Sequence, residues 1–292
     1  MSILVTGGTG TVGSAVVQEL SQRKIPVKVL TRDPAKATGL PAGATAVRGN
    51  LLEVPSVRQV FKGIESVFLL NPVGLTETAE ALMALTQMRI DGVKRVVYLS
   101  VHEADSAAYL PHFGSKVGIE EAIKRSGLAF TILRPNNFFQ NDYWFKDVIL
   151  QYAVYPQPLG NSGVSRVDVR DIAEAAAIAL TSTAADGETV DLVGPDAVTG
   201  ASTAQIWSEV LGKPVAYGGD DLDAWEKVQL QYLPDYMVFD FKEMYRHFQK
   251  NGLKATPAAI ERQTTLLGHA PRDFRSFANE TARAWTGATA GA

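Results

Sequence analysis

The sequence predicts an α/β fold, a doubly wound parallel sheet followed by a smaller, mostly helical carboxyl-terminal lobe. Short apolar runs rich in β-branched residues alternate with segments of helical periodicity from residue 3 to about residue 133. Such an alternation requires parallel strands with helices on both faces of the sheet. The 292 residues, 46% of them hydrophobic, are enough to bury a large core. We expect the sheet domain in residues 1–151 and the smaller lobe in residues 152–292, with about 164–194 returning to the sheet domain.

The first expected strand, residues 3–5, runs into a glycine-rich turn and a helix over residues 14–22. Glycines let a ligand approach the backbone, and the unpaired N–H groups and dipole of a helix amino terminus attract an anion. Strand, turn and helix in this order predict a dinucleotide site with its pyrophosphate on the turn. Bulk at Gly10 would block that approach. The expected contacts are Gly7, Thr9, Gly10, Thr11, Val12 and Gly13.

The second expected strand, residues 26–30, ends just before Arg32 and Asp33. An acidic residue near this point binds the adenosine ribose of NAD, whereas an arginine can pair with the 2′-phosphate of NADP. Arg32 therefore favours NADP(H). Asp33 keeps NAD(H) open, because it is the acid if the strand runs one residue longer.

Three further strands are expected at residues 45–51, 66–70 and 95–100, with helices at 55–62 and 77–91 between them. Residues at the carboxyl ends of parallel strands line the ligand crevice. Asn50, Leu51, Leu70 and Asn71 are therefore expected to contact adenine and ribose. The alternative is that they are ordinary residues at the start of loops.

Ser100 ends the fifth expected strand, and His112 and Lys116 share one face of the following helix. This pattern resembles short-chain dehydrogenases, where a Ser and a Tyr-x-x-x-Lys motif hold the nicotinamide ribose and supply a proton. Here His112 stands where the Tyr belongs. It is a candidate acid or a residue that orients the loop; Tyr109 replaces it only if the helix begins earlier, which Pro111 disfavours. Phe113 is a candidate substrate contact.

The glycine turn, the Thr31-Arg32-Asp33-Pro34 turn and the stretch from Lys116 to Asn141 together resemble the NmrA-like family of atypical short-chain dehydrogenases. The resemblance covers nearly the whole chain. It implies a place close to type 2 NAD(P)H quinone oxidoreductases, although the family also includes cofactor-sensing regulators without catalysis. It also implies that Pro135, Asn136, Asn137 and Phe138 contact the nicotinamide. Absence of the catalytic Tyr is normal in this family.

An aromatic run follows residue 137 and includes Phe138, Phe139, Tyr143 and Trp144. Flat apolar side chains suit a pocket for a planar acceptor, and Phe138 and Tyr143 are the candidates; the alternative is that the run is core. A strand at 190–195 is expected to return to the sheet. Helices are expected from 203 to 285, with residues 287–292 frayed.

Composition limits the remaining functions. The chain has no cysteine, which excludes disulfides and thiolate chemistry and agrees with a cytoplasmic location. No signal peptide or membrane-length apolar run is evident, and a net charge of -3 predicts no nucleic-acid partner. The histidines show no metal-ligand spacing, and no Gly-x-Ser-x-Gly motif indicates a hydrolase. We expect no metal and a monomer or homodimer.

These observations predict a reductase that passes hydride from NADPH to a quinone or a conjugated carbonyl such as an enone. In this reading Arg32 selects the cofactor and Lys116 holds its ribose. The alternative is a non-catalytic NAD(P)-sensing regulator that acts through a protein partner.

Overall fold

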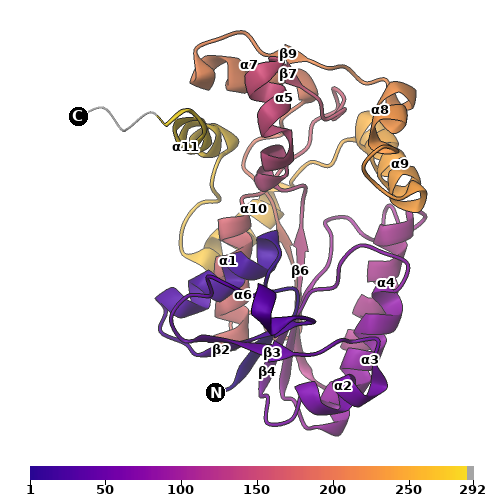
Figure 1. The fold of residues 1–292 in the computed structure, drawn as a ribbon, viewed down its shortest axis with the longest axis vertical. Coiled ribbons are helices and arrows are strands. Elements are labelled where there is room, and N and C mark those ends of the chain that lie inside the picture. Colours follow the sequence, from indigo (N-terminus) through magenta and orange to yellow (C-terminus); the bar gives the residue numbers. More distant parts are fainter. Residues whose placement is uncertain (288–292) are drawn as a thin grey trace. The chain divides into compact units, whose positions relative to one another are not determined.

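The computed structural model describes residues 1–287 (Figure 1). These residues form two compact units. The first unit consists of Met1–Pro135, Val169–Leu192 and Arg262–His269. The second consists of Asn136–Asp168, Val193–Glu261 and the segment that begins at Ala270. The chain thus first leaves the sheet unit after residue 135, whereas the sequence placed the boundary at 151. Apart from residue 287, the segment expected to fray lies outside the described residues.

A seven-stranded parallel sheet forms the centre of the first unit, in the order β3-β2-β1-β4-β5-β6-β8. The strands are β1 (Ile3–Val5), β2 (Val27–Thr31), β3 (Ala44–Arg48), β4 (Ser66–Leu69), β5 (Arg95–Leu99), β6 (Ala129–Pro135) and β8 (Glu188–Leu192). The strand order reverses between β1 and β4. In doubly wound sheets, ligands bind outside the carboxyl ends of the strands at such a point.

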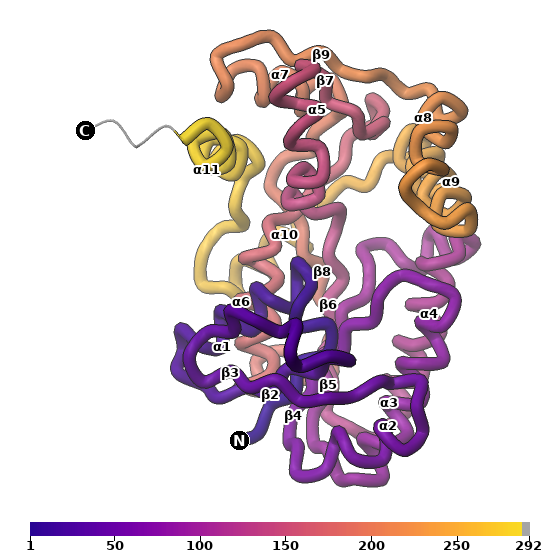
Figure 2. The backbone as a smooth tube through the Cα atoms, viewed as in Figure 1, coloured from indigo at the N-terminus to yellow at the C-terminus, as the bar shows by residue number. Residues whose placement is uncertain are grey.

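Helices cover both faces of this sheet. α1 (Thr11–Gln22) and α6 (Val169–Thr181) lie on one face, and α2 (Val54–Val60), α3 (Glu77–Ile90) and α4 (Pro111–Lys124) lie on the other (Figure 1). Apolar strand residues such as Leu4, Val67 and Ile132 are fully buried against Met88 and Ile119 of the second helical layer. Figure 2 shows β8 beside β6, although the first segment of the second unit and α6 separate these strands in the sequence.

The first helix begins at Thr11, earlier than its apolar periodicity predicts. Gly13 lies inside the first turn of this helix. A Cβ at this position would come within 2.1 Å of the carbonyl oxygen of Gly7. The glycine turn and the helix therefore overlap in sequence, and only glycine fits at their contact.

The second unit is mostly helical. It contains η2 (Phe139–Phe145), α5 (Lys146–Gln151), α7 (Gly200–Leu211), α8 (Leu222–Gln229), α9 (Asp235–Asn251), α11 (Phe274–Thr286) and the short parallel pair β7 (Val154–Tyr155) and β9 (Ala216–Tyr217). α10 (Pro257–Leu267) spans the division between the units at residue 261. In the aromatic core of this unit, Trp207 stacks on Trp285 at 4.8 Å, and Phe139 packs against Phe274 and Phe277.

Candidate cofactor site

The glycine turn is joined to the end of β4. The Thr6 hydroxyl donates to the carbonyl oxygen of Leu70 at 2.8 Å and accepts from the Leu70 amide at 2.7 Å. Gly7 adopts φ +63°, and a Cβ there would come within 2.1 Å of the Leu70 side chain. Asn71 follows directly. The structure therefore brings the predicted contacts at the glycine turn together with Leu70 and Asn71.

Gly10 differs from the other glycines of the turn. A Cβ at Gly10 would meet only the Gly7 carbonyl oxygen, at an ordinary 3.4 Å, and the residue is exposed. The fold itself thus does not require glycine at this position. A bound group that approaches the backbone closely would supply the reason for it.

The amino terminus of α1 is free to bind an anion. Gly10 is its N-cap and no side chain caps the helix, whereas α7 in the other unit carries a complete Thr199–Ser202 capping box. Within residues 1–287, the N–H groups of Thr11, Val12 and Gly13 donate to no protein acceptor. Exposed Thr9 and Thr11 border the same turn. N–H groups and helix dipole together suit a diphosphate.

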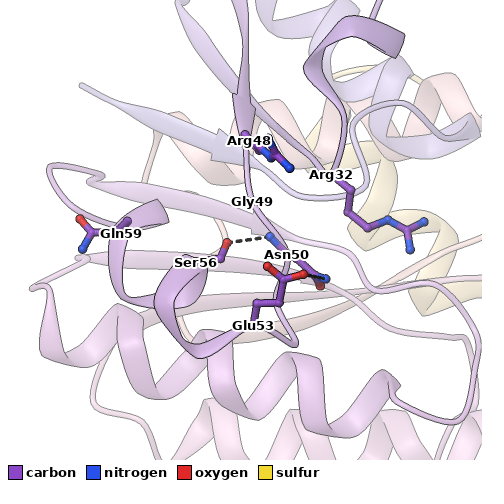
Figure 3. A pocket seen from close by; sticks show the side chains of 7 residues that line it. All are labelled: Arg32, Arg48, Gly49, Asn50, Glu53, Ser56 and Gln59. Carbon is purple, nitrogen blue, oxygen red and sulfur yellow. Dashed lines mark hydrogen bonds between the residues drawn. The ribbon is translucent and has the colours of Figure 1, made fainter.

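Two arginines lie at the ends of neighbouring strands, next to this turn in the strand order. Arg32 follows β2, Arg48 ends β3, and both line a pocket of about 380 Å³. Figure 3 shows the side chains that line this pocket, among them Asn50, whose side-chain amide donates to the Glu53 carboxylate at 2.9 Å. The lining residues are Arg32, Arg48, Gly49, Asn50, Glu53, Ser56 and Gln59.

Asp33 does not take the place of Arg32 in this pocket. Its carboxylate caps η1 (Pro34–Lys36) by accepting from the Ala35 amide at 3.2 Å. Arg48 was not predicted as a site residue, although it lies within an expected strand next to the glycine and asparagine that end it. Leu51 packs in the hydrophobic core, and its role as a cofactor contact stays a prediction.

Lys116 is a buried residue of α4. Its ammonium donates to Glu77 Oε1 at 2.6 Å, and the side chains of the two residues are 9% and 1% exposed. The ammonium also lies 5.9 Å from the centre of the Tyr98 ring. Burial, and then the charges of Glu77 and Glu120, raise the pKa of the Tyr98 hydroxyl well above its ordinary value. Glu77 was not predicted as a site residue, because it lies 39 residues from Lys116 in the sequence.

Ser100 lies at the predicted place, but its hydroxyl is engaged. It donates to Glu120 Oε1 at 2.5 Å, and Arg134 binds the same carboxylate through Nε at 2.8 Å and Nη2 at 2.5 Å. Arg134 also binds the exposed Asp105, and this bond lowers the pKa of that carboxyl.

His112 and Phe113 occupy the first turn of α4. Because this helix begins at Pro111, the exposed Tyr109 lies outside it. The His112 side chain is buried, and its ring meets the fully buried ring of Phe113 edge to face at 4.6 Å. The roles of these residues as acid and substrate contact stay predictions.

The predicted nicotinamide loop begins at Pro135, the last residue of β6, and continues into the second unit. There a buried arginine holds it: Arg166 donates to Asn137 Oδ1 at 2.9 Å and to the Phe138 carbonyl at 2.7 Å. The same guanidinium pairs with Asp142 at 2.7 Å, and both side chains are fully buried. Half-exposed Tyr143 packs against Phe277 of the same unit. The roles of Asn137, Phe138 and Tyr143 stay predictions.

Comparisons with known proteins identify the family of the chain. The NmrA-like family matches residues 1–278. The chain belongs to the NmrA-like family. It is 31% identical to the NAD(P)H azoreductase of Xenophilus azovorans over 286 residues, which cover 97% of this chain and 99% of the relative. The sequence analysis therefore identified the family correctly.

Two solved structures have the same fold as this NmrA-like chain. An NADPH-dependent quinone oxidoreductase from Escherichia coli complexed with NADPH has a TM-score of 0.84 at 22% identity, covering 96% of this chain and 99% of its own. A triphenylmethane reductase from Citrobacter sp. complexed with NADP(H) has a TM-score of 0.83 at 22% identity, covering 97% of this chain and 100% of its own. Within residues 1–287, every helix is too short or too polar to span a lipid bilayer.

Proposed function

We propose that this NmrA-like chain is an NADP(H)-dependent oxidoreductase whose acceptor is a quinone or another flat, conjugated molecule. The support for the cofactor is structural. Gly10 is a glycine that the fold does not require, the first N–H groups of α1 lack protein acceptors within residues 1–287, and two arginines at the ends of β2 and β3 line one pocket. These features fit a diphosphate and an additional phosphate on the adenosine ribose.

Each group of residues would bind a different part of the cofactor. The turn from Gly7 to Gly13 would hold the diphosphate, Arg32 and Arg48 would pair with the 2′-phosphate, and Lys116 would hold the nicotinamide ribose. When bound, NADPH supplies the hydride. Asn50, Leu70 and Asn71 would line the sides of the cofactor. Asn137 and Phe138 would contact the nicotinamide, and Phe138 and Tyr143 would contact the acceptor.

The Ser100–Glu120 hydrogen bond is the main reason for proposing a quinone-like acceptor. The only proton of the Ser100 hydroxyl is directed to a buried carboxylate, and His112 replaces the tyrosine expected of a carbonyl reductase. A ketone needs an acid beside its oxygen as the alkoxide develops. A quinone spreads the charge over its conjugated ring and can take protons from water. The site thus suits acceptors that need no protein acid.

The names of the relatives point to acceptors of the same class. The azoreductase, the quinone oxidoreductase and the triphenylmethane reductase are each named for a conjugated acceptor. We extend only this shared property to the present chain. A monomeric or homodimeric state and a cytoplasmic location remain part of the proposal.

Turnover distinguishes this function from a cofactor sensor. We expect NADPH oxidation with at least one member of a panel of benzoquinones, naphthoquinones, azo dyes and enones, followed at 340 nm. Lys116→Ala should lower kcat/KM at least tenfold, while Lys124→Ala, at a more exposed lysine of the same helix, should change it less than twofold. Tight NADPH binding without turnover of any acceptor would instead favour the regulator.

A further inference from the structure

Glu77 has a buried carboxylate of which only one oxygen has a hydrogen-bond partner within residues 1–287. It is the first residue of α3, its side chain is 1% exposed, and Oε1 accepts from Lys116. Its other oxygen, Oε2, is buried and has no hydrogen-bond partner within residues 1–287. Burying an ion pair costs more desolvation than a pair of apolar residues would, and a free carboxylate oxygen adds to that cost. Stability alone therefore does not account for Glu77.

Unused hydrogen-bonding capacity lies on both sides of this ion pair. The Lys116 ammonium has three N–H groups, and within the described residues Glu77 is its only hydrogen-bond acceptor. The carbonyl oxygen of the Asn71 side chain is also buried without a partner, while its amide nitrogen is directed to Glu80 at 3.4 Å. Glu80 lies one turn along α3 from Glu77, on the same face. Two acceptors, Glu77 Oε2 and Asn71 Oδ1, and the remaining N–H groups of Lys116 are thus available to a ligand.

The order of the strands places these groups at a defined part of the dinucleotide. The glycine turn follows β1, the arginine pocket lies towards β2 and β3, and Asn71, Glu77 and Lys116 lie on the opposite side, where β4 and β5 end. A cofactor centred on the turn with its adenosine towards Arg32 extends its second ribose towards Glu77. That ribose carries two free hydroxyls, each of which can donate to a carboxylate and accept from an ammonium.

We propose that Glu77 is a cofactor-binding residue that accepts a hydrogen bond from a hydroxyl of the nicotinamide ribose while it orients Lys116 towards the same ribose. This inference rests on the proposed NADP(H) function and adds a residue to it. The carboxylate also sets the direction of the cofactor. It repels a 2′-phosphate, so the phosphorylated ribose is favoured only at the arginine pocket.

Two ligands separate this role from a structural one. NADP⁺ contains both riboses, whereas 2′,5′-ADP contains only the phosphorylated adenosine half. We would measure both dissociation constants by titration calorimetry for the native chain, Glu77→Gln and Glu121→Gln, a control that removes an exposed carboxylate from α4. Glu77→Gln should weaken NADP⁺ binding by about tenfold or more, the value of a charge-assisted hydrogen bond, and leave 2′,5′-ADP within twofold. Glu121→Gln should change neither.

Any other result contradicts either the role of Glu77 or the proposed function. Equal weakening of both ligands, or no weakening of either, overturns the role of Glu77 and leaves the proposed function intact. A native chain that binds neither ligand overturns the function itself. If Glu77→Gln does not fold, Glu77→Asp replaces it, because the negative charge beside Lys116 is kept while the carboxylate retracts by one methylene. A selective loss of at least threefold for NADP⁺ is then expected, and unchanged NADP⁺ affinity overturns the inference.

Discussion

Ser100 Oγ lies 2.5 Å from Glu120 Oε1, and both residues are almost completely buried. The serine hydroxyl therefore donates to the protein itself and has no proton left for a substrate. We predict that Ser100→Ala lowers kcat with a quinone less than about threefold. Loss of a proton donor would instead lower it about a hundredfold or more. Steady-state kinetics with saturating NADPH decides between the two, with Ser115→Ala, a partly buried serine on α4, as the control.

Gly10 and Gly13 should respond oppositely to the same substitution. Gly10→Ala should keep the native melting temperature, because the added methyl meets only the Gly7 carbonyl oxygen at 3.4 Å, but it should weaken NADPH binding at least tenfold. Gly13→Ala should lower the melting temperature markedly, because its Cβ would lie 2.1 Å from that oxygen. Calorimetric unfolding and titration of both variants test this. Unchanged NADPH affinity in Gly10→Ala would contradict a diphosphate at the turn.

Arg32 and Arg48 should select between the two nicotinamide cofactors. Arg32→Asp should shift the preference from NADPH towards NADH by about one to two powers of ten, since it removes a phosphate pair and adds repulsion. Arg48→Ala should weaken NADPH binding severalfold and leave NADH unchanged. Dissociation constants for both cofactors provide the measurement. Arg58→Ala, at the end of α2, is the control. An equal loss for NADPH and NADH would place the 2′-phosphate elsewhere.

Breaking the Arg166–Asp142 pair should be costly. Both side chains are fully buried, and Asp142 also accepts from Trp207 at 2.9 Å and Gln157 at 2.7 Å. Arg166→Met leaves this carboxylate without its cation, which should lower the free energy of unfolding by about 3 to 5 kcal/mol. Arg246→Met, which breaks an exposed pair with Glu243, should lower it by less than about 1 kcal/mol. Denaturant titration measures both, and similar losses in the two variants would refute the prediction.

Tyr98 carries a hydroxyl that has no hydrogen-bond partner within residues 1–287, in a side chain that is fully buried. Tyr98→Phe removes this unpaired polar group and should leave the free energy of unfolding unchanged or raise it by about 1 kcal/mol. Tyr155→Phe, in contrast, loses contacts with Asp142 at 3.3 Å and Arg166 at 3.2 Å and should lower it. Chemical denaturation at neutral pH compares the two.

The same tyrosines predict how stability depends on pH. Burial raises the pKa of Tyr98, Tyr155 and Tyr245 above the ordinary value in the folded chain. Above about pH 10 the unfolded chain releases these protons while the folded chain keeps them, so stability is present below that pH and falls as the pH rises further. Each such tyrosine adds about 1.4 kcal/mol per pH unit to the slope. The free energy of unfolding of Tyr98→Phe should therefore fall less steeply between pH 10 and 11 than that of the native chain.

The elements that could be predicted from sequence are those set by local pattern. The strand Ile3–Val5, the glycine turn and the helix Glu77–Ile90 each appear in a short window, and their alternation dictated the parallel sheet. Arg32 and Lys116 were found because motifs fix their spacing. The same motifs, with the stretch up to Asn141, identified the NmrA-like family.

The partners of these residues could not be predicted in the same way. Glu77 pairs with Lys116 across 39 residues, Ser100 with Glu120 across 20, and Asp142 with Arg166 across 24. No periodicity links such positions, because they meet only after separate helices pack on the sheet. The position of Arg48 at a strand end could be predicted from the sequence. The pocket that it shares with Arg32 could not, because it depends on how β2 and β3 pair.

Segments of the two units alternate along the sequence, which affects how the chain can fold during synthesis. The sheet is completed only by β8, and α1 packs against α6, yet residues 136–168 of the other unit must leave the ribosome before either partner exists. A nascent chain that stops at Pro135 therefore exposes one side of α1 and the open edge of β6. Neither unit can be obtained by a single truncation, and a fragment ending at residue 135 is expected to aggregate during synthesis.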